Sequence, residues 1–267
     1  MLITKNHAKA KLEAGELSLG IGLRQARTVD IAHIAKTCGF DWLFIDMEHN
    51  SMDVDVAAQI CAGALTAGIT PIIRVPGHES YHATRLLDAG AMGIVVPHVS
   101  TAAEAAHVAN VCRFPPAGHR SIPGLLPQVG FESLPLADVV LAINRETLLV
   151  IMIETKEGLE NVDAIAAVPG IDVLLVGCND LAAELGVTGQ VGHTKIAAAI
   201  DTVCTACVKH GKHAGLGGVY DDALMKFYVQ KGARFILSGS DLAFLMAGAK
   251  ARTNMLRGIP LPSESQR

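Results

Sequence analysis

The chain has 267 residues and a formal net charge of −4; half of its residues are hydrophobic and 18% are charged. This length fits one large domain, and the composition supplies a sizeable core that argues against disorder. A slightly acidic chain with 4% aromatic residues lacks the basic patch and the stacking residues of nucleic-acid-binding proteins, so we expect no nucleic-acid partner. We find no apolar signal segment and no run of 18 apolar residues, which predicts a cytoplasmic protein without a membrane partner.

Six cysteines are scattered through apolar segments. The one close pair, Cys204 and Cys207, has C-x-x-C spacing but lies inside a helical pattern rather than at a helix start, where a redox thiol is activated. We therefore expect all six to be reduced and mostly structural.

Eight apolar runs alternate with amphipathic segments whose apolar residues recur about every 3.6 positions. The expected strands span 17–23, 42–45, 71–75, 93–97, 148–153, 173–176, 213–217 and 235–237. The expected helices span 29–37, 54–67, 81–88, 102–112, 158–167, 195–210, 221–230 and 243–257. This repeat predicts an α/β fold, a single (β/α)8 TIM barrel, with a doubly wound sheet as the alternative.

We expect residues 1–258 to form the barrel domain and residues 259–267 to form a flexible C-terminal tail. The long connection 113–147, with a short helix near 136–144, breaks the rhythm; we expect it at the catalytic rim as a functional or contact surface. The last helix is apolar at 242–247, which predicts that it packs against other subunits of a homo-oligomer.

Ionisable residues follow three of the expected strands at once. Asp46, Glu48 and His49 follow the second strand, Glu154 the fifth and Asp180 the sixth. In α/β barrels the carboxyl ends of the strands meet at the mouth where active sites are built. The pattern predicts metal-assisted acid/base chemistry.

Glu154 and Asp180 follow neighbouring strands, so their carboxylates can converge on one point. Two carboxylates with open positions suit a hard cation such as Mg²⁺ or Mn²⁺. The alternative is that each carboxylate caps the following helix, as Asp180 could before Leu181.

His49 is the candidate general base, because its ordinary pKa lies near neutrality. Asp46 is expected to orient the His49 ring, and Glu48 to be a supporting or ion-paired group. Arg74 ends the third strand, where it either meets a structural carboxylate or receives an anionic substrate. A chance histidine in a polar loop is the alternative for His49.

Glycines at 215, 217 and 218 and the segment 238–240 follow strands seven and eight, where barrels often bind phosphate. This pattern favours a rival function, a phosphosugar isomerase or lyase.

From about Leu19 to Leu242 the sequence resembles the class II pyruvate-dependent aldolases of the 4-hydroxy-2-oxoheptanedioate aldolase (HpcH/HpaI) family. The blocks that carry the resemblance are Trp42-Leu43-Phe44-Ile45-Asp46-Met47-Glu48-His49, Ile73-Arg74-Val75, Leu87-Asp88-Ala89-Gly90, Pro115 to Arg120, Ile153-Glu154-Thr155 and Gly177-Cys178-Asn179-Asp180-Leu181. Departures are Met47, Ser121, Cys178-Asn179 and Met152, which stands where the family usually has a glutamine.

The resemblance implies reversible cleavage of a 4-hydroxy-2-oxo acid to pyruvate or hydroxypyruvate and an aldehyde, with a divalent metal (Mg²⁺, Mn²⁺ or Co²⁺) as cofactor. It implies that Glu154 and Asp180 hold the metal and that Arg74 steadies the enolate. It also implies that Asp88 reaches a neighbouring subunit's site, within a hexamer built from dimers. The expected site residues are His49, Asp46, Arg74 and Asp88 for catalysis, Glu154 and Asp180 for the metal, and Arg74, Asn179, Asp180 and Leu216 for substrate. A Schiff-base aldolase, with Lys156 as the nearest lysine, and a non-catalytic 2-oxo acid-binding barrel are further alternatives.

Overall fold

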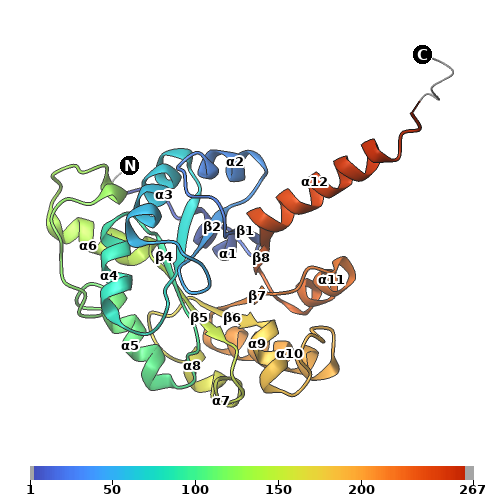
Figure 1. Ribbon diagram of the computed structural model, residues 1–267. Helices are drawn as coiled ribbons and strands as arrows, with labels where there is room; N and C mark the ends of the chain where they lie inside the picture. The colour runs from blue at the N-terminus through green and yellow to red at the C-terminus, as the bar shows by residue number, and fades with distance from the viewer. Residues whose placement is uncertain (1–2, 262–267) are drawn as a thin grey trace.

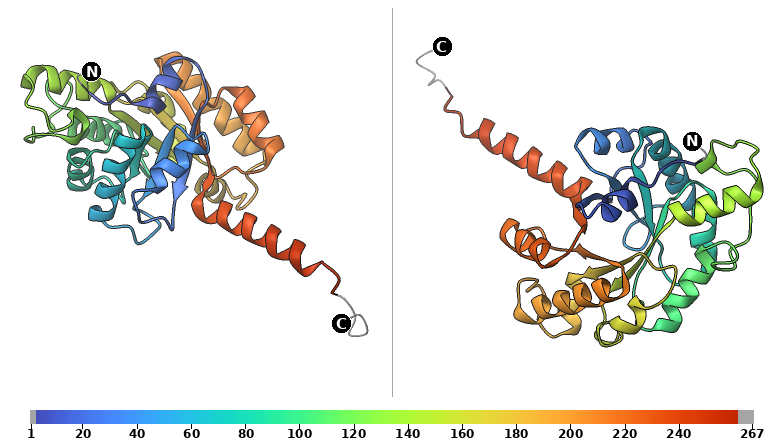
Figure 2. Two further views of the ribbon diagram at one scale, coloured as in Figure 1. Left: turned by 90° about the horizontal axis from the view of Figure 1, so that it is seen from above. Right: turned by 180° about the vertical axis from the view of Figure 1, so that it is seen from behind.

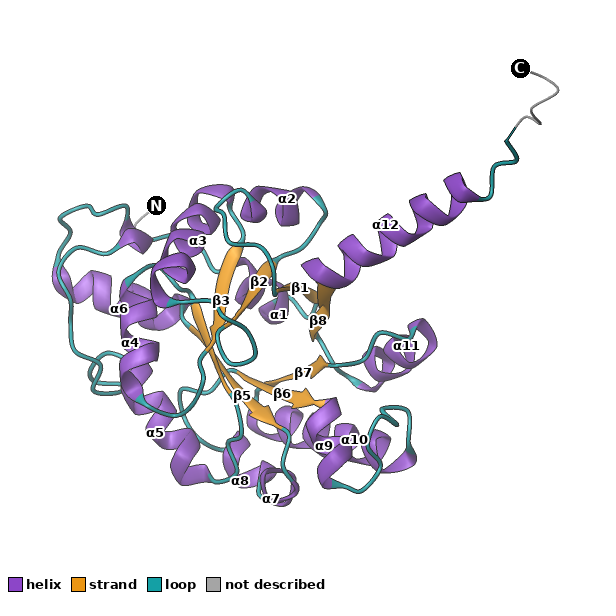
Figure 3. Cartoon of the chain, in the orientation of Figure 1, coloured by secondary structure: helices purple, strands orange, loops and turns teal. Residues whose placement is uncertain are grey.

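The computed structural model describes residues 3–261 and contains a closed barrel of eight parallel strands in the order β1 to β8 (Figures 1 and 3). The predicted (β/α)8 barrel is therefore confirmed, and the doubly wound alternative is wrong. The strands are β1 (Ser18–Leu23), β2 (Trp42–Asp46), β3 (Thr70–Arg74), β4 (Gly93–Val96), β5 (Leu148–Ile153), β6 (Val173–Gly177), β7 (His213–Gly217) and β8 (Phe235–Ser240).

Helices surround the barrel and none of those described is long and apolar enough to cross a membrane. They are α1 (His7–Glu13), α2 (Ile31–Thr37), α3 (Val54–Ala67), α4 (Ser80–Asp88), α5 (Ala102–Cys112), α6 (Leu136–Glu146), α7 (Lys156–Glu160), α8 (Val162–Ala166), α9 (Cys178–Glu184), α10 (Thr194–His210), α11 (Asp222–Lys231) and α12 (Asp241–Arg257). A 3₁₀ turn, η1, spans Pro127–Val129.

Alternation along the strands sorts the apolar side chains into two layers. In β2, Leu43 and Ile45 belong to the large core between barrel and helices, whereas Trp42 and Phe44 belong to a smaller core inside the barrel. Trp42 stacks on the Phe235 ring inside, with centroids 4.0 Å apart. The inner layer fills the barrel, so a ligand can enter only at the strand ends.

Some elements differ from the expectation. The one helix expected over 158–167 is two short helices, α7 and α8, which meet at Asn161 because this residue leaves the helical conformation. Two short helices, α1 and α9, have no counterpart among the expected elements. Ala8 and Leu12 of α1 pack against the inner layer. Helix α1 therefore covers the barrel interior at the N-terminal ends of the strands.

The long connection 113–147 lies at the N-terminal end of the strands, so its expected place at the catalytic rim is wrong. It follows α5, which has already returned the chain to that end. Gln128 donates from this connection to the carbonyls of Leu87 and Ala91, just before β4 begins. The connection supports the base of the barrel rather than the site.

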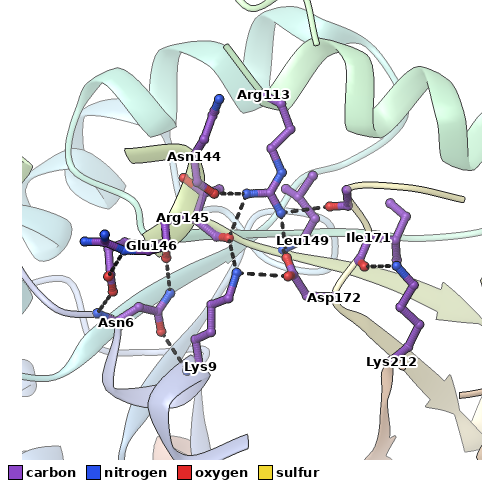
Figure 4. Close-up of polar contacts among 12 residues, drawn as sticks. Asn6, Lys9, Arg113, Asn144, Arg145, Glu146, Leu149, Ile171, Asp172 and Lys212 are labelled. Atoms are coloured by element: carbon purple, nitrogen blue, oxygen red, sulfur yellow. Dashed lines mark hydrogen bonds and ion pairs between the residues drawn. The ribbon is translucent and has the colours of Figure 1, made fainter. Parts of the chain in front are cut away.

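Figure 4 shows the polar network that fastens this connection to the barrel base. The buried Arg113 guanidinium donates to the Thr147 carbonyl at 3.0 Å and to Asp172 Oδ2 at 2.6 Å. Asp172 also accepts from Lys9 Nζ at 3.0 Å and from the Leu149 backbone at 2.8 Å. Each charge in this network has a partner.

Helix α12 extends away from the barrel in every view (Figures 1 and 2). None of its residues is buried, and Phe244, Leu245, Met246, Met255 and Leu256 are exposed. The predicted tail begins at Ile259, but residues 262–267 lie outside the described residues, so its flexibility stays a prediction.

Arg113→Met should lower the free energy of unfolding by about 3 kcal/mol or more, because it leaves Asp172 and three carbonyls with fewer partners in a buried setting. Urea denaturation measures this loss. The matched control is Lys209→Met, which removes an ion pair with Asp163 in which both side chains are exposed. Its free energy of unfolding should stay close to that of wild type. Equal losses in both variants would contradict the assignment of the network to stability.

Candidate active site

A cavity of about 170 Å³ lies at the C-terminal mouth of the barrel. Residues from strands β1, β2, β3, β5, β6, β7 and β8, and from the segments that follow them, line it. The charged or ionisable ones are Arg24, Asp46, His49, Arg74, Cys178, Asp180 and Tyr220.

The inward face of each strand continues into this cavity. Phe44, two residues before Asp46, belongs to the inner layer, and Ile72 stands in the same relation to Arg74. In β5, Val150 and Met152 are inner residues, and Glu154 follows at the next inward position. The alternation of inward and outward residues along each strand, which can be read from the sequence, therefore brings the predicted charged groups together at the mouth of the barrel.

The Arg74 guanidinium is held from two sides. Its Nε and Nη2 donate to the two Asp46 oxygens at 2.9 and 2.7 Å, and Nη1 lies 2.9 Å from Glu48 Oε2. Met152 Sδ is 4.0 Å from the same Nη1. Arg74 thus meets a structural carboxylate and also lines the cavity, so the two alternatives for this residue coexist.

Asp46 contacts the backbone of His49 rather than its ring. Asp46 Oδ1 accepts from the backbone N–H groups of Glu48 and His49 at 3.1 and 3.3 Å. The carboxylate beside the ring is Glu48, whose Oε2 lies 3.7 Å from His49 Nε2. The expected pairing of Asp46 with the His49 imidazole is absent here, because Arg74 occupies both Asp46 oxygens.

Glu154 is 1% exposed, and only one of its oxygens is satisfied. Oε1 accepts from the His98 backbone N–H at 2.8 Å, whereas Oε2 has no hydrogen-bond partner. Burial raises the pKa of Glu154 above its ordinary value; the His98 N–H opposes this effect, and the Asp180 charge adds to it. An orphaned, buried carboxylate oxygen is the kind of group that a cation would satisfy.

Asp180 and Asn179 lie in the first turn of α9 and line the cavity. Gly177 rather than Asp180 is the N-cap residue, so the expected cap role of Asp180 is wrong. A Cβ atom on Gly177 would come within 2.4 Å of Glu154 Oε2, so only glycine leaves room for that carboxylate beside the cavity.

The donor set fits a divalent cation that takes part of its coordination from other sources. Glu154 and Asp180 supply carboxylate oxygens, which hard cations prefer. Among residues 3–261, no group of three or more His, Cys, Asp or Glu side chains is arranged to hold a metal. The protein would thus contribute two carboxylates and leave positions open for substrate. Burial raises the pKa of the Cys178 thiol to about 12, so this thiol is protonated at neutral pH when no cation is bound.

Three expected site residues are not among those that line the cavity. Glu154 lies directly beside it, next to Gly177, whereas Asp88 and Leu216 do not reach it. Asp88 ends α4 at the opposite end of the barrel and accepts from the buried Arg120 Nη2 at 2.6 Å. Leu216 packs in the outer core between β7 and the helices, so its side chain faces away from the cavity. Lys156, the proposed Schiff-base lysine, lies in the first turn of α7 with an exposed side chain and does not line the cavity.

The expected site omitted three residues that the structure brings to it. His98 follows β4, with ring nitrogens 3.3 Å from Glu154 Oε1 and 3.2 Å from Glu48 Oε1. Arg24 follows β1 and Tyr220 follows β7, and both line the cavity. All three follow expected strands, so the rule that found Asp46 and Glu154 could have found them.

The sequence profile of the HpcH/HpaI aldolase/citrate lyase family matches residues 24–247. The chain belongs to that family. It is 38% identical over 265 residues to a 4-hydroxy-4-methyl-2-oxoglutarate aldolase of Hapsidospora irregularis, with 98% of each chain covered. It is 36% identical over 251 residues to a hydroxypyruvate/pyruvate aldolase of Roseobacter denitrificans, covering 92% of this chain and 95% of that one.

Among solved structures, the HpcH/HpaI aldolase from Desulfitobacterium hafniense superposes with a TM-score of 0.90 at 29% identity, over 94% of this chain and 97% of that one. The resemblance seen in the sequence is therefore confirmed. The prediction that the chain is an aldehyde-lyase is also confirmed, because its family and the relatives described above are aldolases.

Asp46→Asn should reveal a pH-dependent part of the stability. Burial opposes ionisation of Asp46, but the Arg74 hydrogen bonds and charge outweigh it and lower the Asp46 pKa. This contribution is fully present above the ordinary pKa of an aspartate and is lost as the pH falls through the lowered value. Thermal unfolding of both proteins from pH 7 to pH 3 should show a difference in Tm that narrows below about pH 4. A constant difference would contradict this explanation.

Proposed function

We propose that the chain reversibly cleaves a 4-hydroxy-2-oxo acid to pyruvate, or hydroxypyruvate, and an aldehyde or ketone, with a divalent metal (Mg²⁺, Mn²⁺ or Co²⁺) held by Glu154 and Asp180. The observation that carries the proposal is the buried Glu154 carboxylate, whose Oε2 is unpaired beside the cavity that Asp180 lines. The names of the relatives, a 4-hydroxy-4-methyl-2-oxoglutarate aldolase and a hydroxypyruvate/pyruvate aldolase, support the same reaction type.

When bound, the cation would polarise the 2-keto group and stabilise negative charge on its oxygen. His49, exposed at the mouth, takes the proton from the C4 hydroxyl as the C3–C4 bond breaks. The electron pair of that bond moves into an enolate, beside which the Arg74 guanidinium is already fixed by Asp46. Return of this proton from His49 to C3 then gives pyruvate and restores the free base. The backbone near Asn179 and Asp180 would receive the pyruvate carboxylate.

The rival functions have less support. An imine mechanism needs a lysine in the cavity, and none of the described lining residues is a lysine. The glycine segments after β7 and β8 do line the cavity through Gly217, Gly218 and Gly239, so they could admit an anion. Borohydride trapping with pyruvate would reveal an imine, and competition by inorganic phosphate would reveal a phosphate site. A non-catalytic binding protein would give no cleavage product and no loss in His49→Ala.

The cavity is polarised in a way that favours a substrate with a second carboxylate. The carboxylates lie on the side of β2, β5 and β6, whereas β1, β7 and β8 contribute the donors Arg24, Tyr220 and Ser240. Among residues 3–261, Arg24 forms no ion pair, and its Nη2 reaches the His49 carbonyl at 3.4 Å. We assign Arg24 to a carboxylate on the aldehyde or ketone part of the substrate.

The apolar, uncovered α12 supports a homo-oligomer in which a second copy of the chain covers this helix. A hexamer built from dimers stays our proposal for its size. Asp88, remote from the cavity of its own chain, would act at a neighbour's site in such an assembly. Leu216 could contribute only through its backbone, because its side chain is in the outer core.

Chelation should abolish cleavage of 4-hydroxy-4-methyl-2-oxoglutarate, and Mn²⁺ or Mg²⁺ should restore it. Asp180→Asn should lower kcat/KM at least 100-fold at low metal concentration, because one of two carboxylate ligands is lost. Both effects are measured as the rate of pyruvate release in an assay coupled to a dehydrogenase. Full turnover in a metal-stripped sample, checked by elemental analysis, would refute the proposal.

Arg24→Gln should change which substrates are cleaved rather than abolish cleavage. The ratio of kcat/KM for 4-hydroxy-4-methyl-2-oxoglutarate to that for 4-hydroxy-2-oxovalerate, which lacks the second carboxylate, should fall about tenfold or more. Arg24→Lys keeps the charge but not the paired donors, so its ratio should lie between those of wild type and Arg24→Gln. The control is Arg27→Gln, whose guanidinium donates, within the described part of the chain, only to the carbonyls of Arg24 and Ala26. An unchanged ratio would refute the role of Arg24.

A further inference from the structure

His98 follows β4 and Pro97 in an unusual backbone conformation. Its φ of +53° lies in the left-handed region, which residues with a Cβ atom rarely adopt. Phe131 is the only other non-glycine residue with positive φ among those described, and it lies in an exposed connection. Residues held this way cluster at functional sites, where surrounding contacts maintain them.

This conformation directs both the backbone and the ring of His98 at Glu154. The backbone N–H donates to Glu154 Oε1 at 2.8 Å, and ring Nδ1 lies 3.3 Å from the same oxygen. The other oxygen, Oε2, is left without a partner. His98 therefore occupies one oxygen of the carboxylate and leaves the second for a ligand.

The other side of the His98 ring faces Glu48. Ring Nε2 lies 3.2 Å from Glu48 Oε1, and Glu48 Oε2 lies 2.9 Å from Arg74 Nη1. A continuous row of charged and polar groups thus crosses the mouth from Glu154 through His98 and Glu48 to Arg74. It connects the ends of β5, β4, β2 and β3.

We propose that His98 is a positioning residue that fixes the Glu154 carboxylate for metal binding and ties it, through Glu48, to Arg74. The inference rests on the proposed metal-dependent function and extends it to a residue outside the expected site. The ring is half exposed, with 53% of the side chain accessible, so packing does not explain its place. Its contacts are with two carboxylates of which the first is a candidate metal ligand.

The variants separate the ring from the backbone. His98→Gly keeps the left-handed backbone and the N–H to Glu154 but removes the ring. His98→Asn tolerates positive φ and restores a side-chain NH2 group that can donate to Glu154. Phe131→Gly is the matched control, because it makes the same kind of change at the other positive-φ residue, away from the cavity.

Mn²⁺ alone is the probe, titrated into the metal-free full-length chain with the free ion followed by electron paramagnetic resonance. We expect His98→Gly to raise the Mn²⁺ dissociation constant about 10- to 100-fold, as loss of a group that orients a metal ligand commonly does. His98→Asn should recover part of this loss, and Phe131→Gly should match wild type. The Mn²⁺ concentration that half-activates cleavage should shift in parallel.

Other outcomes separate this inference from the function it rests on. If wild type binds no Mn²⁺, the proposed metal site and the role of His98 both fail. If wild type binds Mn²⁺ and His98→Gly binds it within twofold, only the positioning role fails. A purely structural His98 would instead lower Tm while leaving Mn²⁺ affinity unchanged. An equal loss in Phe131→Gly would assign the effect to backbone freedom and overturn the inference.

Discussion

The Glu154 carboxylate is the group on which the site depends, because it is buried and half satisfied at the end of a strand that is otherwise entirely apolar. An ionised carboxylate in such surroundings is costly unless a positive charge or hydrogen-bond donors compensate it. One oxygen has the His98 N–H, and the other has none. The fold maintains an unfavourable arrangement that a bound cation would turn into a favourable one.

The charges around Glu154 also favour a bound cation. Four carboxylates lie at or beside the mouth, those of Asp46, Glu48, Glu154 and Asp180. Among residues 3–261, Arg74 is the only permanently charged partner in their ion pairs, and it pairs with Asp46 and Glu48. When the carboxylates are ionised and the histidines are neutral, four carboxylates and the guanidinium groups of Arg74 and Arg24 leave a formal charge of −2. Excess negative charge in a confined cavity attracts cations. The same excess repels an anionic substrate, so a 2-oxo acid needs the cation and the donors on the opposite side of the cavity.

Much of this arrangement could be predicted from the sequence, because it follows from strand periodicity. The apolar runs located the eight strands to within a few residues at each end, and the charged residues that end or follow β2, β3, β5 and β6 lie at the mouth or directly beside it. Parity also contains information that the prediction missed. Gly217 lines the cavity, so Leu216, one residue away, must face the helices.

Contacts between side chains could not be predicted in the same way. Asp46 lies three residues from His49, yet both of its oxygens are taken by Arg74, which is 28 positions away in the chain. The choice depends on rotamers and on the register that places Asp46 beside Arg74 across β2 and β3. His98 lies in none of the sequence blocks that carry the family resemblance. Its role depends on a positive φ, which the residue pattern did not predict.

The N-terminal base and the C-terminal mouth of the barrel both contain carboxylates, but these carboxylates differ in how far their charge is compensated. At the base, Asp172 is paired with Arg113 and Lys9 and bonded to the Leu149 backbone, so its charge is compensated within the chain. At the mouth, Glu154 has a single backbone donor, and its neighbour Glu48 is shared by Arg74 and two histidines. A compensated charge stabilises the fold, whereas an undercompensated one lowers stability and persists only where a ligand makes use of it. This contrast supports a functional site at the mouth independently of family membership.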